Sequence, residues 1–97
     1  MVKGTAPKMT PDLQQIIAGV TGALPDVEWE QLQVTYPADD DGLWFFRRQG
    51  RRWWDVQIES SSGTCPFWVE TNLDNEHRRG QTPDEVVETI VALLLRS

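Results

Sequence analysis

The chain has 97 residues and a net charge of −6, with 39% apolar and 25% charged side chains. This length is that of one domain, and the apolar content excludes a disordered chain. The longest strongly apolar run, Ile90 to Leu95, is far shorter than the roughly 20 residues that a membrane-spanning helix needs. The acidic excess disfavours nonspecific binding to nucleic acid or to an anionic membrane. We therefore expect one acidic, folded domain without a membrane segment.

Two features predict a reducing, cytoplasmic location. Cys65 is the only cysteine, so the chain cannot form an internal disulfide. Residues 1–8 lack the charged and apolar pattern of a secretion signal. Residues 1–9 have no periodicity and contain Gly and Pro, which predicts a flexible N-terminal tail ahead of a single domain over 10–97.

A helix is expected at each end of this domain. Thr10 is an N-cap residue followed by proline, and apolar residues then recur at helical spacing, which predicts a first helix over 11–22. Thr82 caps the second helix in the same way, and Glu85 completes a capping box. The residues expected to face the core from the second helix are Val86, Val87, Ile90, Leu93 and Leu94.

Four strands are expected between the helices, where the apolar spacing changes to two and turn-forming sequences intervene. Their predicted ranges are 28–36, 43–49, 51–60 and 67–71. The order helix, four strands, helix predicts an α+β fold in which a four-stranded antiparallel meander carries both helices on one face.

The face on which each tryptophan lies depends on the turn at Gln49-Gly50. A two-residue hairpin turn there would pair Phe46 with Trp53, and Trp44 with Asp55. The core face would then carry Leu43, Phe45, Trp54, Val56 and Ile58, together with Leu32, Val34, Phe67 and Val69. The outer face would carry Trp44, Phe46, Trp53, Asp55, Gln57, Glu59, Trp68 and Glu70. A register shift of one residue would exchange the two faces.

The expected outer face is unusually rich in large aromatic side chains. Trp44, Phe46, Trp53 and Trp68 together would exceed the apolar area that monomeric proteins usually expose. The N-terminal tail, arginine side chains lying on the rings, or a sheet-to-sheet homodimer would cover them. The further candidates are a protein partner and a stacking ligand. Trp29 is out of phase with the rest of its strand and stays unassigned.

A basic hairpin interrupts the acidic sequence. Arg47, Arg48, Arg51 and Arg52 lie within six positions, beside three tryptophans. Arginine beside tryptophan is the combination that holds phosphate and stacks on bases in single-stranded nucleic-acid sites. The other interpretation is that these arginines keep the hairpin soluble and bind nearby acidic residues.

No set of residues has the spacing of a catalytic or metal site. His77 is the only histidine and is interpreted as a solvated loop residue, since no partner for proton transfer is identified. Cys65 has no neighbouring base and is interpreted as a small apolar core residue. The acidic turn at 39–42 lacks the ligand spacing of a calcium loop, and zinc-binding pairs are absent. We expect no catalytic residue, cofactor or metal ion.

The order of elements and the acidic charge are similar to those of several families of small bacterial accessory proteins, including toxin-neutralising immunity proteins and secretion chaperones. This likeness is one of architecture, and it favours a protein-binding module over an enzyme. The resulting hypothesis is a noncatalytic cytoplasmic module that binds a protein partner, or a second copy of itself, through Trp44, Phe46, Trp53 and Trp68. The alternative is binding of single-stranded nucleic acid or a phospholigand at the basic hairpin.

Overall fold

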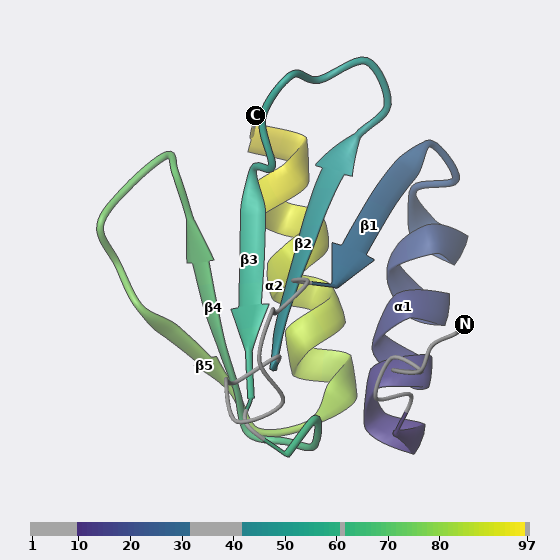
Figure 1. Cartoon of the computed structure of the whole chain (residues 1–97), viewed down its shortest axis with the longest axis vertical. Helices are drawn as coiled ribbons and strands as arrows, with labels where there is room; N and C mark the ends of the chain where they lie inside the picture. The colour runs from purple at the N-terminus through teal and green to yellow at the C-terminus, as the bar shows by residue number, and fades with distance from the viewer. Residues whose placement is uncertain (1–9, 32–41, 61, 97) are drawn as a thin grey trace, which may run out of the picture.

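The computed structural model describes residues 10–31, 42–60 and 62–96 and shows an α+β fold (Figure 1). The elements are α1 (Pro11–Ala23), β1 (Val27–Gln31), β2 (Leu43–Arg48), β3 (Val56–Glu59), β4 (Phe67–Thr71), β5 (Arg78–Gly80) and α2 (Pro83–Arg96). All five strands form one antiparallel meander in chain order. The predicted tail, residues 32–36 of the first predicted strand and residues 39–41 of the acidic turn lie outside the described residues.

The predicted fold class is confirmed, but the sheet has five strands and not four. The additional strand, β5, lies between the last predicted strand and the second helix, and it pairs with β4 through Trp68 and Arg79. With only three residues, β5 is too short to show the apolar alternation that marks a strand in a sequence.

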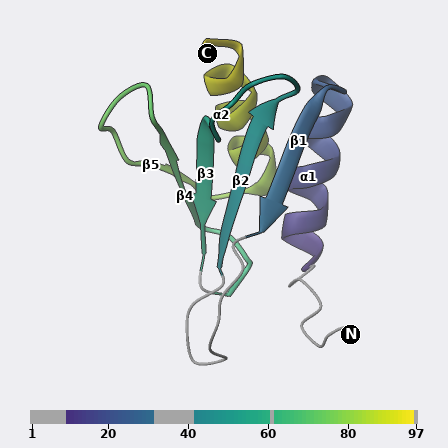
Figure 2. The same cartoon turned by 45° about the horizontal axis from the view of Figure 1, so that its top comes forward.

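Both helices lie on one face of the sheet (Figures 1 and 2). They pack against each other, and α2 also contacts β3, β4 and β5. Their predicted caps are confirmed: Leu13 N donates to Thr10 Oγ1 at 3.1 Å, and Glu85 N donates to Thr82 Oγ1 at 3.2 Å. No helix in the described part of the chain is long and apolar enough to cross a membrane.

The core fills the space between the helices and the sheet. Its buried residues are Leu13, Ile16, Val20, Val27, Trp44, Phe46, Val56, Ile58, Phe67, Val69, Val86, Ile90, Leu93 and Leu94. Trp29 lies half-buried on the same side, because it pairs with Phe46 across β1 and β2. The inward positions predicted for β3, β4 and α2 are therefore confirmed.

The predicted register of the β2–β3 hairpin was wrong. The turn at Gln49-Gly50 does form, with Arg51 N donating to Arg48 O at 3.1 Å and Gly50 at a φ of 87°. The chain does not enter the next strand there, however, because residues 51–55 form a loop before β3 begins. Phe46 pairs with Val56, which lies three positions beyond its predicted partner.

A shift of three positions exchanges the two faces of β2 relative to β3, since any odd shift does so. Trp44 and Phe46, predicted on the outer face, are fully buried beside Ile58 and Val56. Leu43 and Phe45, predicted in the core, lie half-buried on the outer face. Because β2 carries apolar side chains on both faces, burial of apolar area does not choose between the two registers. The backbone hydrogen bond from Asp55 N to Phe46 O, at 3.1 Å, holds the observed one.

Candidate functional site

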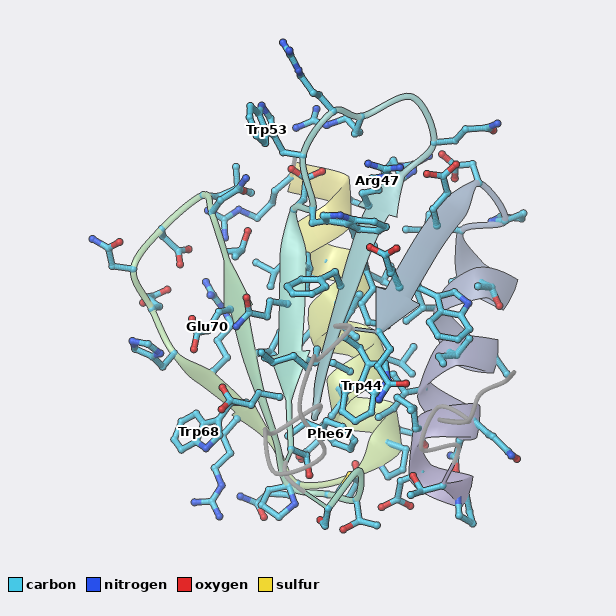
Figure 3. All side chains as sticks on the ribbon, in the orientation of Figure 1. Trp44, Arg47, Trp53, Phe67, Trp68 and Glu70 are labelled. Atoms are coloured by element: carbon cyan, nitrogen blue, oxygen red, sulfur yellow. The ribbon has the colours of Figure 1, made fainter. Side chains whose placement is uncertain are left out.

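The outer face is the face of the sheet opposite the helices. The observed register places on it the side chains of Glu28, Glu30, Leu43, Phe45, Arg47, Gln57, Glu59, Trp68, Glu70 and Arg79. Neither described helix covers this face, and it is the face turned toward the viewer in Figure 3.

An aromatic stack lies at the centre of the outer face. Trp54, predicted in the core, instead folds back from the 51–55 loop onto Phe45, with ring centroids 6.2 Å apart and planes inclined by 40°. The guanidinium carbon of Arg47 lies 4.2 Å from the centre of the Trp54 ring. Arg47 Nε also donates to Glu28 Oε1 at 2.8 Å. Cation–π contact and the ion pair thus hold the Trp54 ring against the sheet.

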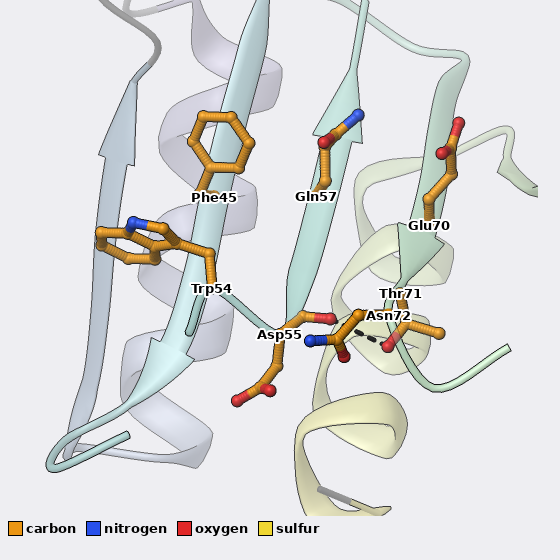
Figure 4. A pocket seen from close by; sticks show the side chains of 7 residues that line it. All are labelled: Phe45, Trp54, Asp55, Gln57, Glu70, Thr71 and Asn72. Carbon is orange, nitrogen blue, oxygen red and sulfur yellow. Dashed lines mark hydrogen bonds between the residues drawn. The ribbon is translucent and has the colours of Figure 1, made fainter. Parts of the chain in front are cut away.

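Asp55 fixes the point at which this loop rejoins the sheet. Its side chain was predicted to point outward, but it is 1% exposed, with Oδ1 accepting from Arg51 Nη2 at 3.2 Å. Its backbone N donates to Phe46 O at 3.1 Å, and its carbonyl accepts from Thr71 Oγ1 at 2.8 Å (Figure 4). Oδ2 is buried without a hydrogen-bond partner in the described part of the chain. These contacts leave the adjacent Trp54 little freedom to move.

Two tryptophans predicted on the outer side are strongly exposed. Trp53, in the loop, is 66% exposed, and Trp68, on β4, is 45% exposed. The guanidinium of Arg52 lies 5.7 Å from the ring centre of Trp53, and that of Arg79 lies 5.6 Å from the ring centre of Trp68. Arginines therefore do lie on the rings, as one interpretation expected, yet much of both side chains remains open to solvent.

A depression of about 270 Å³ separates the aromatic stack from β4. Figure 4 shows Phe45 and Trp54 on one side of it, Glu70 on the other, and Gln57 between them. Its remaining lining residues are Asp55, Thr71 and Asn72. The depression thus has an aromatic wall, a polar floor and a carboxylate opposite the rings.

A second depression, of about 280 Å³, continues from the first along β4 and the loop that follows it. The two share Glu70, Thr71 and Asn72. The predicted loop residue His77 lies here, 66% exposed, with Nδ1 3.1 Å from Glu70 Oε2. None of the described residues that line either depression is Lys or Arg.

The loop beyond β4 is fixed by its own ion pairs. The guanidinium of Arg78 binds both carboxylate oxygens of Asp74, at 3.2 and 2.9 Å, and also Glu76. Arg96, from the end of α2, reaches the same aspartate at 3.4 Å. The hydrogen bond from Arg78 is the main reason that the pKa of Asp74 is far below its usual value, and Asp74 in turn raises the pKa of Arg78.

Three of the four arginines of the basic hairpin have carboxylate partners. Arg47 binds Glu28, Arg51 binds Asp55, and Arg48 Nε donates to Asp26 Oδ2 at 2.8 Å. That last hydrogen bond lowers the pKa of Asp26. The interpretation that these arginines bind nearby acidic residues is thus confirmed for Arg47, Arg48 and Arg51.

Cys65 lies away from the outer face, half-buried and packed against the core. Its backbone N donates to Asp12 Oδ2 at 2.9 Å. Burial, and secondly the negative charge of Asp12, raise the pKa of the thiol. A raised pKa is opposite to what a nucleophilic cysteine needs. The described residues also contain no cluster of three or more His, Cys, Asp or Glu side chains that would hold a metal ion.

Phe45 and Trp54 are the site residues that the sequence interpretation missed. Leu43 to Phe46 form an uninterrupted apolar run, so alternation does not reveal which side of β2 faces the helices. Only the strand register decides this, and the register depends on the unpaired loop. Searches of protein-family models, curated proteins and solved structures find no match to this chain.

Proposed function

We propose that the protein is a noncatalytic cytoplasmic module that binds another protein through the outer face of its sheet. The observation that carries this proposal is the exposure of two tryptophans: Trp68, on the outer face, is 45% exposed, and Trp53, in the 51–55 loop, is 66% exposed. Tryptophan and arginine are the residues most enriched among the side chains that dominate protein–protein binding energy. Both exposed rings have an arginine beside them.

The outer face has the features of an interface and not of a catalytic centre. Phe45 and Trp54 are held in place by stacking, by the cation–π contact of Arg47 and by the contacts of Asp55. A preorganised surface loses little conformational entropy when a partner binds. The raised pKa of Cys65 also disfavours the one thiol-based reaction that the sequence would allow.

The charge of the outer face favours a different protein over a second copy as the partner. Among the described strand residues, the face carries the carboxylates of Glu28, Glu30, Glu59 and Glu70 and the guanidinium groups of Arg47 and Arg79. Two copies that met through this face would bring like charges together, on chains that each have a net charge of −6. The expected partner therefore presents a positively charged surface with apolar groups.

Binding of nucleic acid at the basic hairpin has less support. Arg47, Arg48 and Arg51 already bind carboxylates, which leaves Arg52 as the hairpin arginine without an ion-pair partner among the described residues. Phosphate binding would have to break these pairs. The distinguishing measurement is a titration with single-stranded oligonucleotides at low salt, where quenching of tryptophan fluorescence would favour this alternative.

Random peptides displayed on phage provide a defined probe for the protein-binding proposal. Peptides are selected on the wild-type protein alone, and the affinity of each selected peptide is then measured for the wild type and for the double variant Trp53→Ser, Trp68→Ser. We expect selected peptides to bind the wild type and to lose at least about tenfold in affinity for the variant, since exposed tryptophan anchors contribute about 2 kcal/mol or more. The fold of the variant is checked by circular dichroism and urea unfolding.

Glu88→Gln on the exposed side of α2 is the matched control, because it changes a surface residue on the opposite side of the sheet. Peptides that bind the wild type and the double variant equally would contradict the proposal. Dimerisation of the wild type in sedimentation experiments, abolished in the double variant, would instead identify a second copy as the occupant.

A further inference from the structure

We infer that the depression between the aromatic stack and β4 receives a lysine or arginine side chain of the partner protein. This inference rests on the proposed function, because it assigns chemistry to the same outer face. A basic side chain has an apolar stem and a charged end, and the depression offers a matching surface to each. The aromatic rings lie on one side, and the carboxylate of Glu70 lies on the other (Figure 4).

The aromatic side of the depression is held in position before binding. Trp54 stacks on Phe45, and Arg47 lies 4.2 Å from the centre of the Trp54 ring. The Trp54 ring therefore already has one cation beside it, which leaves the open side of Phe45 to contact the methylene groups of an incoming side chain. Aromatic groups with fixed positions provide such contact at low entropic cost.

The charge around the depression favours a cation over an anion. The ionisable groups that line it are carboxylates, Asp55 and Glu70, and the described lining contains no Lys or Arg. Asp55 is already bound to Arg51, so Glu70 is the carboxylate that remains accessible, with 37% of its side chain exposed. Its present partner, His77, lies on a solvent-exposed loop and is displaced without breaking the core.

The size and polarity of the depression favour one side chain over a small-molecule ligand. Its volume of about 270 Å³ is below the roughly 300–1,000 Å³ of pockets that bind drug-sized ligands. The amides of Gln57 and Asn72 and the hydroxyl of Thr71 supply further acceptors near the carboxylate. The second depression extends the acidic surface past Glu70, so neighbouring basic residues of the same segment also have space there.

The position of the depression connects it with the exposed tryptophans. In Figure 3, Glu70 lies between Trp53, at the upper end of the sheet, and Trp68, at the lower end. We expect an extended segment that contacts Trp68 on β4 to place one basic side chain in the depression and to continue toward Trp53 in the 51–55 loop. This arrangement places the desolvated contact near the centre of the interface, where binding energy concentrates.

The test uses peptides selected on phage as described above, and compares wild type with Glu70→Gln and with His77→Gln. We expect the selected peptides to share a Lys or Arg at one position, and Glu70→Gln to weaken binding by about tenfold, because the charged hydrogen bond is lost. His77→Gln removes the imidazole beside Glu70 but keeps the carboxylate, so binding is expected to be unchanged or tighter. Affinity for the wild type should also fall with added salt.

Three outcomes overturn the inference and leave the proposed function standing. In the first, selected peptides depend on Trp53 and Trp68 but share no basic residue. In the second, replacing the shared basic residue by norleucine, which keeps an apolar chain without the charge, has no effect on affinity. Equal weakening by Glu70→Gln and His77→Gln would show that only the contact between these two side chains matters, and would also overturn the inference. Selected peptides that bind the Trp53→Ser, Trp68→Ser variant as tightly as the wild type would instead contradict the proposed function.

Discussion

Replacement of Gly80 by alanine tests the packing of β5 against α2, which positions Arg79 beside Trp68. A Cβ atom on Gly80 would lie 2.5 Å from Val86 Cγ2, and 3.2 and 3.3 Å from the backbone N and Cα of the same residue. Val86 is in the first turn of α2, where its N donates to Thr82 O at 3.1 Å. The Val86 side chain can rotate away, but the Val86 backbone is held by its hydrogen bond to Thr82 O. The added methyl group would therefore push β5 away from α2.

Overpacking of this kind costs about 1–3 kcal/mol. For a domain of this size each kcal/mol lowers the melting temperature by roughly 4–8 °C. Urea unfolding and thermal melting of Gly80→Ala should therefore show a clear loss of stability with an unchanged m-value. Gly22→Ala is the matched control, because no atom lies within 4 Å of its added Cβ and alanine is the better helix former, by up to about 1 kcal/mol. A Gly80→Ala protein as stable as the wild type would refute the described packing of β5.

Three further changes test other parts of the structure. Trp44→Ser should destabilise the protein by about 3–5 kcal/mol in urea unfolding, whereas Trp53→Ser should change stability by less than about 0.5 kcal/mol; similar effects would contradict the observed register. Asp74→Asn should destabilise the protein at neutral pH, because the pKa of Asp74 is lowered by Arg78 in the folded state. The stabilisation by ionised Asp74 is complete above the ordinary aspartate pKa of 3.8 and is lost as the pH falls toward the lowered pKa. The urea midpoints of the wild type and the variant should therefore converge in acid. Alkylation of Cys65 by iodoacetamide at neutral pH should be slower in the folded protein than in urea, since burial raises the thiol pKa; equal rates would show that the thiol is freely accessible.

The helices were predictable because their signals are local. Thr10 and Thr82 are followed by proline, and the apolar residues after them recur at helical spacing. N-caps and amphipathic periodicity depend only on neighbours in the sequence, so no knowledge of the tertiary structure is needed. The first helix is observed one residue longer than predicted, over Pro11–Ala23.

The sheet was predictable in class and strand order but not in register. The turn at Gln49-Gly50 was identified correctly from its residues, since turn chemistry is also local. The sequence does not show that residues 51–55 form a loop and do not pair with β2 as strand residues. That loop is stabilised by nonlocal contacts, above all by the hydrogen bond from Thr71 to the backbone of Asp55. Contacts between residues that are far apart in the sequence therefore determine which side chains lie on each face of the sheet.

The three-position shift in the register of β2 and β3 moves the proposed interface, but the interface remains aromatic. β2 carries apolar residues on both sides, so burying Trp44 and Phe46 leaves Phe45 on the outer face, where Trp54 folds onto it. In the predicted register the aromatic residues would have covered the outer face evenly. In the observed register they form one fixed stack next to Glu70, with exposed tryptophans at either end. An even apolar surface would favour a broad hydrophobic contact, whereas rings beside an open carboxylate favour a partner that supplies a cation. The register thus determines both the place at which a partner is expected to bind and the charge that it is expected to carry.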